Sequence, residues 1–340
     1  MKDFAGKTAF VTGGASGIGF AMASAFLEAG MNVMLADIEE AALERALKSL
    51  ASYDNRLGGM VLDVSLREEY ERVAEETFAK FGKVHVLCNN AGVSRAGPVE
   101  TVSPTDWEWV WSVNLRATIT GIQLFLPHIR AHGEGGHIVS TASMAGLVGN
   151  ALSGPYASTK YAIVGVSEVL ADELKDTNIG VSVLCPAVVK TQMPFNGRNR
   201  PGRFGGSFTL ESDPANAERN QRYVTNNETG LDPKHVGQMV LRAIRDNRLY
   251  IVTDPARRSA VQSRYERIMA GFDACEEDHA TFVKLLRSNR LSGPHGLCFI
   301  PCGGLVGEGS SDDWVRCPRA TCARGGAAFD VGIRHGARCR

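Results

Sequence analysis

The sequence predicts an α/β fold, with helices on both faces of a doubly wound parallel sheet of about seven strands. From Lys7 onward, short β-branched or apolar runs alternate with longer amphipathic segments, which is the pattern of alternating strands and helices. A helix that connects two strands returns the chain to the same end of the sheet through a right-handed crossover, so these strands are parallel. A glycine-rich turn after the first run is a further sign of this class.

Seven runs have the length and composition of strands. They are residues 8–11, 32–36, 59–62, 84–88, 137–140, 181–184 and 249–252. Apolar spacing and end signals predict helices in the longer segments between and after them. These are residues 39–50, 67–81, 105–132, 156–175, 233–247 and about 257–288.

The chain of 340 residues is longer than the ~100–200 residues of a typical domain. We interpret residues 1–291 as one domain with additions. Residues 192–231 interrupt the alternation with Pro, Gly, Asn and Arg, and a loop of this length is usually functional or disordered, so we expect a substrate lid. Residues 292–340 are rich in Gly, Arg and Cys without apolar periodicity, which predicts a disordered or non-native tail.

Charge and hydropathy exclude several classes of partner. Lys plus Arg and Asp plus Glu both number 37, so no net field attracts nucleic acid or an anionic membrane. No stretch reaches the ~18 apolar residues of a membrane span, and the N-terminus lacks the features of a secretory leader. Cys88, Cys185 and Cys275 are too scattered for a disulfide framework. We therefore expect a small-molecule ligand and a cytoplasmic location.

The tail contains a second group of cysteines. Cys298 with Cys302 and Cys317 with Cys322 superficially resemble pairs of metal ligands, and two histidines lie nearby in the sequence. The spacings are looser than those of zinc sites, and strand or turn signals around them are missing. We expect no metal, because a disordered extension or out-of-frame readthrough of a gene rich in G and C fits the composition better.

The glycine-rich turn runs from Thr12 to Gly19, between the first expected strand and the next helix. Glycines permit a tight turn and let the backbone approach a pyrophosphate, whose charge then lies at a helix N-terminus. Such a turn is weak evidence alone, but a strand before it and a helix after it favour phosphate binding. The expected architecture is therefore of the Rossmann type and binds a dinucleotide.

Asp37 closes the second expected strand, where a carboxylate can accept hydrogen bonds from an adenosine ribose. A 2′-phosphate would meet negative charge there, and no Arg or Lys lies in the glycine turn or directly after Asp37. NAD is therefore favoured over NADP, although a solvated Asp at a strand end is the alternative. Asp63 and Val64, after the third strand, either hold the adenine edge or belong to a helix cap.

Several separate motifs resemble the classical short-chain dehydrogenase/reductase family over roughly residues 4–255. They are T-G-x-x-x-G-x-G at residues 12–19, N-N-A-G at residues 89–92, and Y-x-x-x-K at Tyr156 and Lys160. Ser143 lies at the family's spacing before Tyr156, and Asn114 lies where the family keeps its catalytic Asn. More loosely, the lid and the C-terminal helix are similar to the branch with bacterial dehydrogenases of lignin-derived aryl alcohols.

The resemblance implies a nicotinamide-dependent oxidoreductase that acts on a CH–OH group and assembles as a homodimer or homotetramer. One departure is Ala187, where the family usually has Gly after Pro186. The residues implied to be catalytic are Asn114, Ser143, Tyr156 and Lys160. Those implied to contact the cofactor are Gly13, Ser16, Gly17, Ile18, Gly19, Asp37, Asp63, Val64, Asn90, Ala91, Gly92, Tyr156, Lys160, Pro186, Val189 and Thr191.

The chemistry requires a group that takes the hydroxyl proton of an alcohol as the hydride leaves. For Tyr156, the reference pKa of ~10 must fall by ~3 units, which needs roughly 4 kcal/mol of preferential stabilisation of the phenolate. Lys160 lies one helical turn along, where its ammonium can favour the phenolate and bind the nicotinamide ribose. Ser143 would donate to the substrate oxygen, and Asn114, if it interrupts the helix, would hold a proton-relaying water.

Apolar residues follow the strand that carries Ser143 and recur in the lid, which predicts a hydrophobic or aromatic substrate. They are Met144, Leu147, Val148, Leu152, Met193, Phe195, Phe204 and Phe208. The alternative is that they pack the lid on the domain. Arg198, Arg200 and Arg203 are candidates to bind an anionic substrate group, or are merely solvated.

Two other functions stay open. A non-catalytic redox sensor or scaffold would bind the dinucleotide without turnover, although the complete Tyr-Lys-Ser-Asn set argues against it. A reductase that works mainly toward the alcohol would use the same residues, because direction depends on cellular cofactor ratios. The motifs identify neither the substrate nor its stereochemistry.

Overall fold

A computed structural model describes residues 1–210 and 217–289 of the chain, with the side chains of the last helix described as far as Leu285. One unit, Met1–Glu276, contains the sheet and the helices packed on it. A second unit begins at Glu277, and its described part is the end of helix α9 (Arg258–Asn289). The tail predicted at residues 292–340, with its cysteines, lies outside the described residues.

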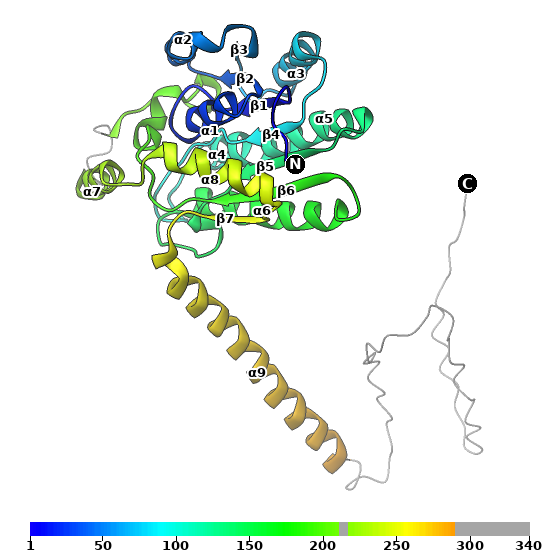
Figure 1. Cartoon of the computed structure of the whole chain (residues 1–340). Helices are drawn as coiled ribbons and strands as arrows, with labels where there is room; N and C mark the ends of the chain where they lie inside the picture. Colours follow the sequence, from blue (N-terminus) through cyan, green and yellow to red (C-terminus); the bar gives the residue numbers. More distant parts are fainter. Residues whose placement is uncertain (211–216, 290–340) are drawn as a thin grey trace, which may run out of the picture. The chain divides into compact units, whose positions relative to one another are not determined.

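Seven strands form one sheet in the first unit, in the order β3-β2-β1-β4-β5-β6-β7 (Figure 1). They are β1 (Thr8–Thr12), β2 (Asn32–Asp37), β3 (Leu57–Val61), β4 (Val86–Asn89), β5 (Gly136–Thr141), β6 (Ile179–Cys185) and β7 (Tyr250–Val252). Every neighbouring pair is parallel. The predicted fold class is confirmed. All seven predicted strands are present with small shifts at their ends.

The helices cover both faces of the sheet because alternate residues of each strand point to opposite sides. Val11 and Leu35 belong to the apolar core on one face, whereas Phe10 and Met34 belong to the core on the other. The first face is covered by α1 (Gly17–Glu28), α2 (Glu40–Ser49) and α8 (Pro233–Asp246). The second is covered by α3 (Arg67–Phe81), α5 (Ala117–His132) and α6 (Gly154–Glu173).

The segment predicted as one long helix over residues 105–132 is helical throughout, but it is not a single regular α-helix. The segment comprises α4 (Pro104–Trp111), a π-helical turn η2 (Ser112–Arg116), and then α5. Asn114 lies within η2 and is fully buried. Apolar periodicity continues through the interruption, so the sequence pattern does not reveal where the hydrogen-bond register changes. Such π-turns occur frequently at functional sites.

The segment predicted as a lid is partly helical. It contains η4 (Met193–Asn199), η5 (Gly202–Phe204) and α7 (Ala217–Glu228). A parallel bridge between Val189 and Leu231 joins the two ends of this insertion. That it serves as a substrate lid remains a prediction.

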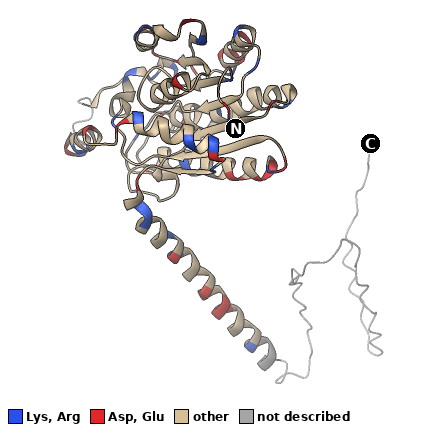
Figure 2. Ribbon diagram, in the orientation of Figure 1, with Lys and Arg blue, Asp and Glu red and all other residues tan. Residues whose placement is uncertain are grey.

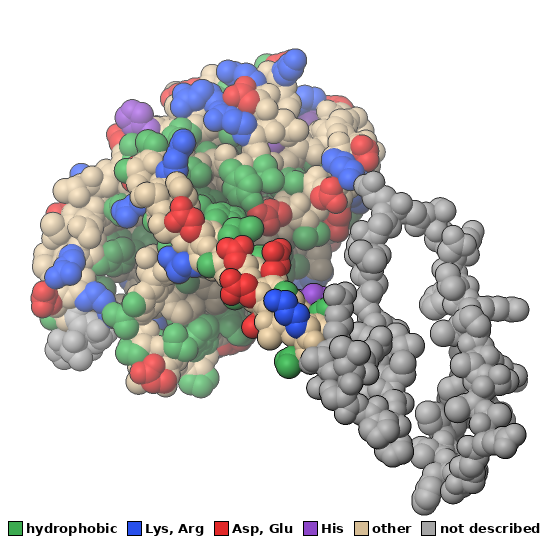
Figure 3. All heavy atoms as spheres, turned by 90° about the horizontal axis from the view of Figure 1, so that it is seen from below, with side chains coloured by type: hydrophobic (Ala, Val, Ile, Leu, Met, Phe, Trp, Pro, Cys, Tyr) green, Lys and Arg blue, Asp and Glu red, His purple; other side chains and the backbone are tan. Residues whose placement is uncertain are grey.

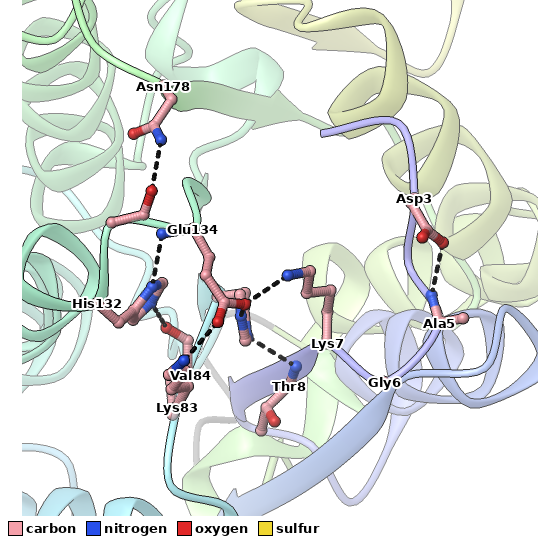
Figure 4. Close-up of polar contacts among 12 residues, drawn as sticks. Asp3, Ala5, Gly6, Lys7, Thr8, Lys83, Val84, His132, Glu134 and Asn178 are labelled. Atoms are coloured by element: carbon pink, nitrogen blue, oxygen red, sulfur yellow. Dashed lines mark hydrogen bonds and ion pairs between the residues drawn. The ribbon is translucent and has the colours of Figure 1, made fainter.

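A polar network links the amino ends of the central strands (Figure 4). The Glu134 carboxylate, just before β5, accepts from Lys7 at 2.6 Å, from Lys83, and from His85 Nε2 at 3.0 Å. The other ring nitrogen of His85 accepts from the Thr8 amide at 3.2 Å. These contacts connect β1, β4 and β5 at their amino ends. Ligands of open α/β sheets bind at the opposite side, at the carboxyl ends of the strands.

Basic and acidic side chains are interspersed along the elements of the first unit (Figure 2), in agreement with the zero net charge of the chain. On the face drawn in Figure 3, apolar side chains lie among charged ones of both signs. Within the described ranges, no helix combines the length and the apolar character needed to cross a membrane.

Candidate active site

A cleft runs along the carboxyl ends of the central strands. It extends from Asp37 after β2, past the glycine turn after β1 and Asn90 after β4, to Tyr156 and Lys160 on α6. Strand order reverses between β1 and β4, because the chain first builds β2 and β3 outward on one side and then continues on the other. This is the topological switch point at which doubly wound sheets bind ligands.

The glycine turn is shaped to bring backbone close to a bound phosphate. Gly13 and Gly17 have φ values of 61° and 53°, which L side chains rarely adopt. A Cβ on Gly13 would lie 3.0 Å from the Ala91 Cα atom, and one on Gly17 would lie 3.0 Å from Thr191 Cγ2. Ser16, the N-cap of α1, makes no side-chain cap hydrogen bond, so the amides of the first turn are available to an anion. These residues fit a dinucleotide pyrophosphate.

The carboxylate of Asp37 is held in a fixed orientation at the other end of the cleft. Its Oδ2 atom accepts from the Ala15 amide at 3.0 Å, and its Oδ1 atom from the Glu39 amide at 3.1 Å. Burial raises the pKa of Asp37, and these two hydrogen bonds oppose that shift. Each oxygen keeps a lone pair for a ribose hydroxyl.

The three lid arginines are each paired with a carboxylate of the protein. Arg198 Nη2 lies 2.6 Å from Glu39, Arg203 Nη2 lies 2.6 Å from Asp63, and Arg200 Nη2 lies 3.1 Å from Asp106. Neither predicted role, anion binding or free solvation, describes this arrangement. The sequence could not show it, because each pair joins residues far apart along the chain. The first two pairs bring η4 and η5 to the part of the cleft lined by Asp37, Glu39 and Asp63.

Two of the aromatic residues predicted to meet substrate instead pack the lid. Phe204 is buried in a cluster with Trp109 and Val110, and Phe208 lies edge-on to Trp109 at 5.9 Å between centroids. The packing alternative is therefore correct for these two residues. Met193 does line the cleft, while Phe195 is 43% exposed.

Tyr156 and Lys160 lie on the same face of α6, one turn apart, at the end of the cleft. The Lys160 Nζ atom is 5.3 Å from the centroid of the Tyr156 ring and donates to the Thr141 carbonyl at 2.7 Å. Lys160 is almost completely buried, so its charge is shielded from water. Ser143, at the N-cap of the short helix after β5, hydrogen-bonds to Tyr156.

Asn114 positions the loop that follows β4. Its Oδ1 atom accepts from the Val93 amide at 2.8 Å, while Nδ2 donates to the Val93 carbonyl at 2.9 Å and to Thr159 Oγ1 at 3.1 Å. A Cβ on Gly92 would lie 3.4 Å from Asn114 Oδ1 and 3.5 Å from Lys160 Nζ, so these three residues meet closely. The π-helical turn at Asn114 meets the condition on which its predicted water-holding role depends, and that role stays a prediction.

Comparison with known proteins identifies the family of the chain. Residues 7–200 match the family model described as short chain dehydrogenase. The chain belongs to the short-chain dehydrogenase/reductase family.

Two curated relatives align with more than half of the length of this dehydrogenase. The C alpha-dehydrogenase of Sphingobium sp. strain SYK-6 is 36% identical over 279 residues, which cover 82% of this chain and 90% of the relative. The 3beta-hydroxysteroid dehydrogenase 2 of Eggerthella lenta is 34% identical over 202 residues, covering 59% and 77%. The match to C alpha-dehydrogenase agrees with the bacterial branch that the sequence resembles.

A solved short-chain dehydrogenase/reductase from Burkholderia phymatum, in complex with NAD, has a TM-score of 0.75 and 36% identity to this chain. The alignment covers 80% of this chain and 97% of the neighbour. Together, the family and its named relatives establish an oxidoreductase that uses a nicotinamide cofactor and acts on CH–OH groups of small molecules.

The site of this dehydrogenase contains two strongly shifted groups. Burial raises the pKa of Tyr156, and the hydrogen bond with Ser143 lowers it. Burial also lowers the pKa of the Lys160 ammonium to about 7. The hydrogen bond with Ser143 therefore only partly offsets the effect of burial on the pKa of Tyr156.

Most residues expected to contact the cofactor line the cleft of the dehydrogenase, with two exceptions. Gly19 lies behind the turn, where a side chain would collide with the Gly13 carbonyl, and Val189 packs in the core beside the sheet. Sequence reasoning missed Glu39, Trp109, Val113, Gln192 and Asn196, which also line the cleft. The sequence does contain a signal for Glu39, because it is an acidic residue only two positions after Asp37. The other four reach the cleft through tertiary packing, which their own sequence does not reveal.

Proposed function

We propose that this dehydrogenase uses NAD to interconvert a secondary alcohol and a ketone of apolar character, with Tyr156 as the acid/base. The observation that carries the proposal is the placement of Tyr156 and Lys160 one helical turn apart, at the end of a cleft that begins at Asp37. A phenol and a buried ammonium so placed can exchange a proton with a substrate hydroxyl at that point of the cleft.

The charges at the adenosine end of the cleft support NAD. The Asp37 carboxylate lines that end, and a 2′-phosphate would meet its negative charge. The NAD complex of the Burkholderia phymatum neighbour agrees with this choice.

When bound, the nicotinamide accepts a hydride from the carbinol carbon or returns one to the ketone. The Tyr156 phenolate takes the hydroxyl proton, and Ser143 donates a hydrogen bond to the substrate oxygen as its charge changes. Lys160 supplies positive charge close to the phenolate, and its Thr141 contact fixes the direction of its side chain. A positively charged cofactor ring bound in this cleft would lower the pKa of Tyr156 further.

Replacing Tyr156 with Phe tests the assignment, because it removes one oxygen from the site. We expect turnover of an alcohol panel to fall by about 10²–10⁴-fold while NAD binding is retained. Unchanged turnover would show that another group is the base. A wild-type chain that binds NAD but turns over no alcohol or ketone would favour the redox sensor or scaffold.

The apolar character of the substrate is supported by Val93, Val113 and Met193, which line the same cleft as Tyr156. A relative is named for a hydroxysteroid, which is an apolar secondary alcohol. Steady-state assays on matched apolar and carboxylated alcohols test this. Equal efficiency with small polar alcohols would contradict it.

A homodimer or homotetramer is supported by apolar side chains that stay exposed on helices of the second face. Trp111 on α4, Ile119 on α5 and Val169 on α6 are 42%, 37% and 59% exposed. Covering such surface stabilises an assembly of copies. A monomer by light scattering at micromolar concentration would contradict this part of the proposal.

A further inference from the structure

Arg198 and Glu39 form a closed polar contact at the adenosine end of the cleft. Arg198 donates from Nη2 and Nε to the same Glu39 oxygen, at 2.6 and 3.0 Å, and Asn199 donates to that oxygen at 3.2 Å. The remaining Arg198 nitrogen, Nη1, donates to the Phe195 carbonyl at 2.9 Å. Every nitrogen of this guanidinium therefore has a partner within the protein.

Glu39 is ionised at neutral pH in this setting. Burial raises its pKa, but the hydrogen bonds from Asn199 and Arg198 outweigh that effect and leave the pKa below its ordinary value. The contact therefore joins a negatively charged carboxylate, Glu39, to a positively charged guanidinium, Arg198. Its contact is charge-assisted, which makes it stronger than a neutral hydrogen bond.

The pair lies beside the carboxylate expected to bind the ribose. Glu39 is two residues after Asp37, and Arg198 is near enough to act on the charge of Asp37. All three residues line the same cleft. The structure therefore brings a cation to Asp37 and Glu39, which have no basic residue directly beside them in the sequence.

An unpaired arginine at this position would favour NADP. The planar fork of a guanidinium binds phosphate in a bidentate manner, and an Arg near the ribose accommodates a 2′-phosphate in dinucleotide folds. The repulsion by Asp37 would then be opposed by a phosphate-binding cation in the same cleft. Discrimination between the two cofactors consequently depends on what holds Arg198.

We propose that Glu39 is a second determinant of NAD over NADP, because it occupies Arg198 and so withholds this guanidinium from a 2′-phosphate. The inference rests on the proposed function, in which this cleft binds NAD. Glu39 acts here as a specificity-determining residue that works through Arg198, without itself touching the reacting atoms.

Calorimetric titration of the full-length chain with adenosine 2′,5′-bisphosphate and with adenosine 5′-monophosphate tests the proposal without turnover. Asp37→Ser provides the background, because it removes the repulsion that would hide the effect. Glu39→Gln and Arg198→Met are added to it singly and together. Glu39→Gln keeps the size of the side chain, and Glu39→Ala serves as a second version if the first variant folds poorly.

In the Asp37→Ser background, we expect Glu39→Gln to tighten bisphosphate binding by about tenfold and to leave monophosphate binding within about twofold. With Arg198→Met also present, the gain should fall below about threefold. An equal gain with and without Arg198 would overturn the proposal, because Glu39 would then act by its own charge alone. No gain in either case would overturn it as well.

The wild-type chain separates this inference from the proposed function. If wild type binds the monophosphate better and the variants behave as expected, both hold. If wild type prefers the bisphosphate, the NAD assignment and the inference fall together. If wild type prefers the monophosphate but the gain does not depend on Arg198, only the role of Glu39 is wrong.

Discussion

The ammonium of Lys160 donates a hydrogen bond to the backbone carbonyl of Thr141, at 2.7 Å, from a position that is only 2% exposed. Thr141 is the last residue of β5, so the end of a central strand fixes the direction of this lysine side chain. Burial at the same point lowers the pKa of Lys160 to about 7. The strand end therefore orients the Lys160 side chain, and burial brings its pKa close to neutral pH.

This pKa predicts that binding of NAD⁺ releases a proton. A positive nicotinamide ring bound in this cleft would disfavour the Lys160 ammonium, and a group with a pKa of about 7 is roughly half protonated at pH 7. Calorimetry in two buffers with different ionisation enthalpies should show release of up to about half a proton per site. Lys160→Met and titration with NADH are the controls, and both should release less. Equal release by Lys160→Met would show that the proton comes from another group.

Asn114→Ala should destabilise the fold. The substitution removes the partners of the Val93 amide and carbonyl, and leaving such groups unpaired costs about 1–3 kcal/mol. Urea unfolding measures the change. Asn150, an exposed residue of the loop before α6, provides the matched control, for which an Ala substitution should cost less than about 0.5 kcal/mol. A loss no larger than that of the control would mean that Asn114 does not hold the Val93 loop.

Arg203→Gln should accelerate release of the cofactor. The ion pair with Asp63 joins η5 to the wall of the cleft, and a partly exposed pair of this kind contributes up to about 1 kcal/mol, or roughly fivefold in rate. Stopped-flow measurement of NADH dissociation tests this, and added salt should speed release from wild type more than from the variant. Arg222→Gln removes an exposed pair with Glu218 on α7 and should leave the rate unchanged. If Arg203→Gln behaves like that control, η5 does not hold the nucleotide.

His137 predicts a loss of stability in acid. Its Nε2 atom lies 2.8 Å from Ser182 Oγ, and the Ser182 hydroxyl itself donates to the Arg248 carbonyl, so Nε2 must carry the proton in the neutral ring. Burial lowers the pKa of His137 from 6.5 to about 3. The unfolded chain therefore binds this proton more readily, and the stabilisation present above pH 6.5 is lost progressively as the pH falls toward 3.

Urea unfolding between pH 7.5 and pH 5 measures this slope. His137→Gln keeps a donor for Ser182 but cannot titrate, so its stability should depend less steeply on pH than that of wild type. Identical slopes would assign the acid sensitivity to other groups, such as His85, whose pKa burial also lowers.

The sequence by itself determined the class of the fold and the residues at the two ends of the cleft. The hydrophobic periods of strands and helices are local properties of the sequence. The glycine turn, Asp37, Tyr156 and Lys160 belong to short motifs, in which the spacing of the residues determines how they lie relative to one another. The predicted strands, and the predicted placement of Tyr156 and Lys160 on one face of a helix, agree with the structure for this reason.

Only the tertiary structure decided what the charged and aromatic residues of the lid contact. Arg198 with Glu39, and Arg203 with Asp63, are separated by more than a hundred residues, and Phe204 packs on Trp109 through the same long-range folding. Asn114, in the π-turn, hydrogen-bonds to Val93, which lies in the loop after β4. Such contacts arise from packing between distant segments, and no periodicity or spacing within either segment encodes them.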